Sequence, residues 1–265
     1  MYPTFSCLLW SILFSPVLAD NHPLPEKSRT EIRHRLESRV AEINEQLKTS
    51  PDSVRLISAR GTAFFHLAQF DLALDDFDRM IKLNPKLDSS HWRRGIALYY
   101  VKRFQKSAEQ FERYHSFDNV DRENGIWRYL AQVRASGLQM AEKELLKYTK
   151  DDRKPFGDVY AMFAGKLSDQ QVLHRIKKST DTAPDKLKQQ FYAYLYIGLY
   201  SHAKGDTESA EQQLREAVAN PWGQQASGGP GYMWHVARVH YNLLRSCRES
   251  PDSEIEAEKT DRIRQ

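Results

Sequence analysis

The side chains that could catalyse a reaction or bind a metal ion are scattered along this sequence. His235 and His240 share a predicted helix, but a spacing of five residues places them on different faces, so they do not converge on one metal ion. The adjacent carboxylates Asp75-Asp76 and Asp151-Asp152 diverge, which argues against paired acid and base roles. The sequence contains no GxSxG, HExxH or GxxxxGK[ST] motif. We therefore expect no catalytic residues, no metal site and no cofactor, and predict that the protein is not an enzyme.

Composition indicates a helical protein with little net charge. The 265 residues include 39 Lys and Arg against 35 Asp and Glu, which gives a net charge of +4. The basic residues are spread along the predicted helices, so we expect no nucleic-acid partner. The sequence holds two cysteines, of which Cys7 lies in the leader described next. Removal of that leader leaves Cys247 without an intrachain disulfide partner.

The N-terminal segment resembles a secretory leader. The run from Cys7 to Ala19 is apolar, too short to span a bilayer and ends in the small-residue triplet Val17-Leu18-Ala19. Export followed by cleavage near Ala19 is the expected outcome. Because no Lys or Arg precedes the run, an apolar segment that stays attached as an anchor remains the alternative.

The strongest pattern in the sequence is a repeat of 34 residues. Small and aromatic residues recur at this interval in two consecutive segments, as do the prolines that precede them. The matching pairs are Pro51 with Pro85, Gly61 with Gly95, Phe64 with Leu98, Phe70 with Phe104, Ala73 with Ser107, and Phe77 with Phe111. A helix pair recurring at this period indicates a solenoid of stacked units.

The period and its residues resemble the tetratricopeptide repeat (TPR). The resemblance implies an all-α helical-repeat solenoid, with small residues where paired helices approach closely. A more divergent third copy puts Tyr129 at such a position, so its two helices should lie further apart. Capping helices are expected at both ends, and the N-terminal one could also form a dimer contact. The predicted divisions are a leader (1–19), a linker and capping helix (20–50), three TPR-like repeats (51–150), a shortened helix pair (151–189), a C-terminal repeat (190–222), a glycine-rich linker and closing helix (223–248), and a charged tail (249–265).

A closer resemblance covers roughly residues 50–244. The order RGIALYY from Arg94, WRYLAQ from Trp127, VYAMFAGKLSDQQVL from Val159 and YLYIGLY from Tyr194 is similar to the NlpI-like family of bacterial envelope lipoproteins. The resemblance implies a periplasmic or envelope adaptor, often homodimeric, for a processing protease and for peptidoglycan hydrolases. Cys7 lies too early and in the wrong context for a lipoprotein cysteine, which argues against lipid anchoring.

By resemblance to TPR proteins, a concave groove lined by the first helix of each repeat should bind a partner protein. Its predicted residues combine Arg, Tyr and Trp, which dominate many protein interfaces. They are Arg55, Ser58, Phe65 and His66 in the first repeat and Trp92, Arg93, Tyr99 and Tyr100 in the second. The alternative for the aromatic residues is packing between repeats.

Three functions remain open from the sequence. We favour an exported adaptor that binds protein partners through the groove. A structural or anionic-polymer-binding envelope component, using the basic surface, is the second. An enzyme built on helical repeats is the third, and it would require histidines and carboxylates to converge in space.

Overall fold

The computed structural model describes residues 22–150 and 152–249, and these residues form an all-α protein without strands. The predicted leader and residues 250–265 of the predicted tail lie outside the described residues. The helices are α1 (Glu26–Thr49), α2 (Val54–His66), α3 (Phe70–Leu83), the short 3₁₀ helix η1 (Pro85–Leu87), α4 (Trp92–Tyr100), α5 (Phe104–Phe117), α6 (Arg122–Ser136), α7 (Leu138–Lys143), α8 (Phe156–Phe163), α9 (Asp169–Lys178), α10 (Ala183–Ala203), α11 (Thr207–Ala219), α12 (Pro221–Gln225) and α13 (Gly228–Glu249).

Paired helices approach most closely where the first helix carries glycine. A Cβ atom added to Gly61 in α2 would lie 2.8 Å from the ring of Phe77 in α3. One added to Gly95 in α4 would lie 2.7 Å from the ring of Phe111 in α5. Gly198 in α10 meets a side chain of α11 at the same distance of 2.7 Å. Because a real Cβ atom does not approach other atoms so closely, these three helix pairs require glycine, and the predicted role of the small residues is confirmed there.

The turns that join paired helices share one backbone conformation. Ala68 and Lys102, which are 34 residues apart, have φ angles of 60° and 61°, and Gly165 and Gly205 have φ angles of 69° and 87°. Each of these residues donates its N–H to the carbonyl three residues earlier, and the next residue donates to the carbonyl five residues before itself. These bonds satisfy carbonyl groups that the end of a helix leaves unpaired. The helix pairs are therefore repeated in turn geometry as well as in sequence.

The third helix pair differs from the prediction. The side chain of Tyr129 in α6 is 1% exposed and packs against the rings of Phe163 in α8 and Tyr200 in α10. The close approach in α6 is at Gly125, where an added Cβ would lie 2.6 Å from the hydroxyl of Tyr148. The second helix, α7, is only six residues long. The 34-residue register therefore does not identify the small position of this pair.

The predicted glycine-rich linker is also wrong in part, because α13 begins at Gly228 rather than at Tyr232. Only Ala226 and Ser227 separate α12 from α13. An added Cβ on Gly231 would lie 2.6 Å from the carbonyl oxygen of Ala226, so this glycine is needed for packing in a tight connection. The glycines here belong to a folded turn and helix start instead of a flexible segment.

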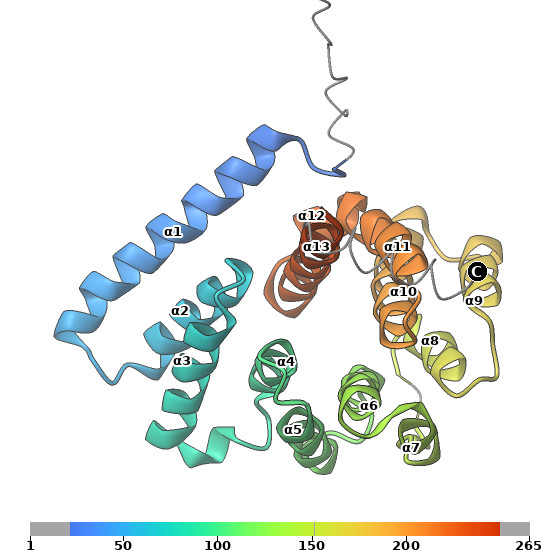
Figure 1. Cartoon of the computed structure of the whole chain (residues 1–265), viewed down its shortest axis with the longest axis horizontal. Helices are drawn as coiled ribbons and strands as arrows, with labels where there is room; N and C mark the ends of the chain where they lie inside the picture. The colour runs from blue at the N-terminus through green and yellow to red at the C-terminus, as the bar shows by residue number, and fades with distance from the viewer. Residues whose placement is uncertain (1–21, 151, 250–265) are drawn as a thin grey trace, which may run out of the picture.

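The helices from α2 to α11 curve around α13, which lies inside the curve (Figure 1). α13 packs against α11, α12 and α2. The first described residues are also tied to α13, because Nε2 of His22 lies 3.0 Å from the side-chain oxygen of Asn242. The closing helix therefore links the two ends of the array.

α1 packs against α2 near its C-terminal end, and its N-terminal end lies on the side of the molecule where α12 and α13 are found (Figure 1). Ile43 and Leu47 near its end are buried, whereas most of its earlier residues are exposed or only half-buried. No helix among the described residues is long and apolar enough to cross a membrane.

Candidate binding site

Half of the predicted groove residues contact α13. The ring of Phe65, which is fully buried, stacks on Tyr232 with 4.9 Å between ring centroids. The imidazole of His66 stacks on that of His235 at 3.8 Å. The hydroxyl of Tyr100 lies 2.9 Å from Nδ1 of His240, and Trp92 packs edge-on against Tyr232 at 5.0 Å. The closing helix thus occupies the part of the concave face that α2 and α4 provide.

The hydroxyl of Tyr100 belongs to a partly buried chain of hydrogen bonds. The second ring nitrogen of His240, Nε2, lies 2.8 Å from Nδ1 of His202 in α10. His240 is 3% exposed, and burial lowers its pKa to about 3. This chain joins α4, α13 and α10, and the lowered pKa keeps the His240 imidazole neutral at neutral pH.

The remaining predicted residues have different surroundings. Tyr99 is 7% exposed and packs against Phe104 and Trp127, so it belongs to the core between helices. Arg93 donates to the hydroxyls of Thr62, at 3.0 Å, and Ser58, at 3.4 Å. Arg55 is exposed on α2. Of the eight predicted residues, His66, Trp92 and Arg93 lie near the start of α13, while Phe65 and Tyr99 are buried and Tyr100 is half-buried against the core.

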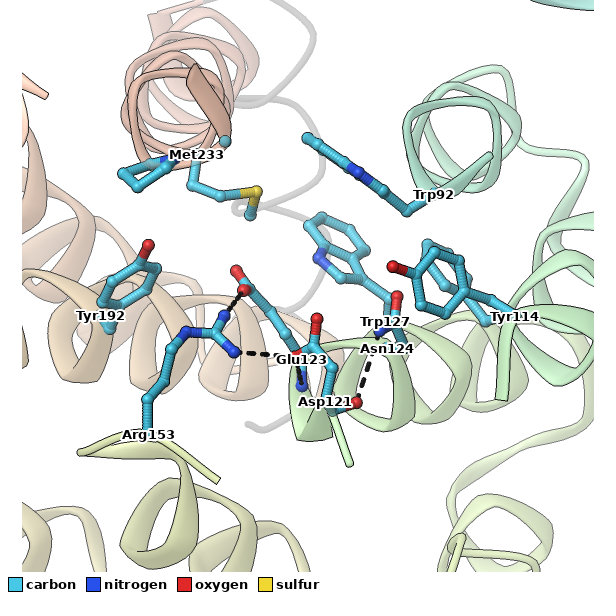
Figure 2. A pocket seen from close by; sticks show the side chains of 12 residues that line it. Trp92, Tyr114, Asp121, Glu123, Asn124, Trp127, Arg153, Tyr192 and Met233 are labelled. Carbon is cyan, nitrogen blue, oxygen red and sulfur yellow. Dashed lines mark hydrogen bonds and ion pairs between the residues drawn. The ribbon is translucent and has the colours of Figure 1, made fainter. Parts of the chain in front are cut away.

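The side chain of Trp92 lines two separate hollows beside the first turns of α13. One is a cavity of about 200 Å³, here called the α6 cavity, which α6 lines together with α4, α5, α10 and α13 (Figure 2). The other, here called the arginine hollow, has a volume of about 460 Å³ and includes Arg35 and Arg93. Trp92 and Gly229 line both. The two hollows are therefore neighbours that share an indole ring.

The α6 cavity contains a cluster of carboxylates around one guanidinium. Asp121, which caps the N-terminus of α6 by accepting from the N–H of Glu123, contacts Arg153 at 3.2 Å. Arg153 also pairs with Glu123 and, at 3.1 Å, with Asp152. The hydroxyl of Tyr196 in α10 donates to Glu123 as well. Three carboxylates thus surround a single arginine side chain.

Burial controls the protonation of this cluster. Removal of Glu123 from water, with the nearby Asp121 charge, raises the pKa of Glu123 to about 7, although Arg153 acts in the opposite direction. Burial likewise raises the pKa of Asp121. The arginine therefore compensates only part of the desolvated negative charge.

Aromatic side chains and a thioether enclose the rest of the α6 cavity. The rings of Trp92, Tyr114, Trp127 and Tyr192 surround it, and the sulfur of Met233 points inward from α13 (Figure 2). Trp127 is 2% exposed, and its indole Nε1 has no hydrogen-bond partner among the described residues. In Figure 2 this nitrogen lies on the side of the ring that faces Glu123. A buried indole N–H without an acceptor is costly, so the cavity has an unused hydrogen-bond donor.

Sequence reasoning did not identify this cavity. Its charged residues come from the start of α6 and from the segment before α8, while α10 contributes tyrosines. No local motif connects Glu123 with Arg153 or Tyr196. Asp121, at the start of α6, is by itself an ordinary helix N-cap and carries no signal of a binding site. Among residues 22–150 and 152–249, no group of three His, Cys, Asp or Glu side chains could hold a metal ion. No known protein-family model matches this sequence.

Proposed function

We propose that the protein is a non-enzymatic adaptor that binds a segment of a partner protein beside the first turns of α13. The α6 cavity and the arginine hollow would hold neighbouring side chains of that segment. One observation carries the proposal: the half-buried Trp92 ring separates a hollow lined by arginines from a cavity lined by carboxylates. An indole with opposite charges on its two sides suits a peptide that alternates polar and apolar contacts.

The resemblance to the NlpI-like family supports the cellular setting of this proposal. The protein would be exported, would lose its leader near Ala19, and would act in the bacterial periplasm or envelope, without a lipid anchor. A processing protease or peptidoglycan hydrolases would be its partners, and the array could act as a homodimer through the exposed part of α1. The TPR character of the repeats is part of the same proposal.

The adaptor proposal is tested by affinity capture from an envelope fraction with the wild-type protein and Trp92→Ala as baits. The matched control is Phe117→Ala, because Phe117 is 62% exposed on α5 and lines neither hollow. We expect partners recovered by the wild type and by Phe117→Ala to be lost with Trp92→Ala, whose affinity should fall by about 2 kcal/mol or more, roughly 30-fold. Circular dichroism checks that helicity is unchanged.

Two results would count against this function. Equal recovery by Trp92→Ala and the wild type, at equal helicity, would remove Trp92 from the interface. Recovery that disappears for all baits after modest addition of salt would favour an envelope component that binds anionic polymers through exposed charges.

A further inference from the structure

The α6 cavity has a chemical preference that the adaptor function does not specify. Its charged lining groups are Asp121 and Glu123 against Arg153, so carboxylates outnumber the cation that contacts them. The Asp121 and Glu123 side chains are only 24% and 12% exposed. Desolvated carboxylates gain strongly from a cation that enters the same site.

The aromatic lining favours an organic cation. The electron-rich faces of indole and phenol rings attract ammonium groups, and Trp92, Trp127, Tyr114 and Tyr192 line the cavity beside the carboxylates. A bare metal ion would meet few oxygen ligands, because no group of three His, Cys, Asp or Glu side chains among the described residues could hold one.

The unpaired indole N–H of Trp127 adds a second requirement. A donor buried in the cavity needs an acceptor, and Nε1 lies on the side of the ring facing Glu123. The ligand should therefore carry a hydrogen-bond acceptor close to its ammonium group. In the first residue of a peptide the carbonyl oxygen lies two bonds beyond the Cα atom that carries the ammonium, whereas in a lysine side chain the nearest carbonyl is remote.

We propose that the α6 cavity binds the free amino terminus of a partner polypeptide. The ammonium group lies between Glu123, Asp121 and the aromatic rings, and the first carbonyl oxygen accepts from Nε1 of Trp127. The volume of about 200 Å³ is below the roughly 300–1,000 Å³ of sites for drug-sized ligands, which suits one terminal residue. The following residues would leave the cavity past Trp92 toward the arginine hollow. This assignment rests on the adaptor proposal for its biological setting, but the amine site itself can be tested separately.

The test uses the full chain and three small probes, followed by the indole N–H signals in ¹H–¹⁵N NMR spectra. The probes are alanyl-alanine amide, which has a free amino terminus, its N-acetylated form, which lacks the charge, and Nα-acetyl-lysine amide, which carries the charge on a side chain. We expect the first to shift the Trp127 signal saturably at pH 7 and the other two to bind at least tenfold more weakly. Trp127→Phe identifies the signal.

Two substitutions connect the binding to the proposed groups. Glu123→Gln keeps the shape of the side chain but removes its charge, and we expect it to weaken alanyl-alanine amide at least tenfold. Glu109→Gln is the matched control, because Glu109 is exposed on α5 outside the cavity, and it should bind like the wild type. Because Trp127→Phe removes the donor, it should also weaken binding of the free-amine probe, which in this variant is followed by the indole signal of Trp92.

The outcomes separate this inference from the adaptor function. Equal binding of the acetylated probe, or unchanged affinity in Glu123→Gln, would overturn the ammonium site. Equal binding of the lysine probe would overturn the assignment to an amino terminus. If no probe binds while Trp92→Ala still loses captured partners, the amine site fails and the adaptor proposal stands. If the free-amine probe binds but Trp92→Ala captures partners normally, the adaptor proposal fails instead.

Discussion

Acidification should destabilise this protein through its buried neutral histidines. Burial lowers the pKa of both His66 and His240 to about 3 and that of His91 to about 4. In the unfolded chain each imidazole returns to a pKa of about 6.5. Since the unfolded state then binds protons first, the stability from these groups is complete above about pH 6.5 and is lost as the pH falls toward 3–4.

The size of the effect follows from these shifts. A pH of 5 is about 1.5 units below the pKa of each imidazole in the unfolded chain, while each imidazole is still neutral in the folded state. The stability lost at pH 5 is therefore about 2 kcal/mol for each of the three histidines. Glu123 acts in the opposite direction, because its folded pKa of about 7 lies above its unfolded value. The stabilising contribution of Glu123 is present below its unfolded pKa and is lost as the pH rises through 7. Acidification from pH 7.5 to pH 5 therefore raises the free energy of unfolding by about 2 kcal/mol through this group. These four groups together should give a net loss of about 4 kcal/mol between pH 7.5 and pH 5, and His235 and His202, whose pKa values burial also lowers, add to that loss.

Urea denaturation followed by circular dichroism at pH 7.5 and pH 5 measures this loss, and His240→Gln isolates one imidazole. Whatever its stability at pH 7.5, we expect this variant to lose about 2 kcal/mol less than the wild type on acidification. His174→Gln is the matched control, because His174 is exposed on α9, and it should follow the wild type. If His240→Gln and the wild type lose the same free energy, the inference that His240 is buried and neutral is refuted.

Two further predictions concern close helix packing and a cap. Gly95→Ala should lower the free energy of unfolding by about 1–3 kcal/mol, because its Cβ would lie 2.7 Å from the Phe111 ring. The control Gly157→Ala, with no atom within 4 Å of the added Cβ, should be neutral or up to about 1 kcal/mol stabilising. Urea denaturation measures both variants, and equal stability of the two would contradict the close approach at Gly95. Asn220→Ala should lower the free energy of unfolding by about 1–3 kcal/mol, since the Asn220 side chain caps α12 and donates to the carbonyl of Leu187. Thermal denaturation measures the loss, with exposed Asn119→Ala as the control. A loss no larger than that of the control would show that the cap is not needed.

The helix pairs were predictable because their constraints are local and repeated. Gly61 with Phe77 and Gly95 with Phe111 are each 16 residues apart, and both pairs meet in the structure at the distances that require glycine. The same logic fails at Tyr129, where the pair is completed by a six-residue helix and the contacts come from α8 and α10. A fixed repeat length predicts the packing of a helix only where the helix that it contacts recurs at the same interval in the sequence.

The position of α13 explains why the predicted groove residues differ so much in exposure. Repeat spacing identifies which residues face inward, but it contains no information on how tightly the array curves or on what fills the curve. In this structure α13 provides rings for Phe65 and His66, so these side chains complete an interior. Trp92 lies where the first turns of α13 leave the α6 cavity open. The residues that form that cavity come from segments distant in sequence, and their shared property, an incompletely balanced buried charge beside an unpaired indole donor, exists only after the chain has folded.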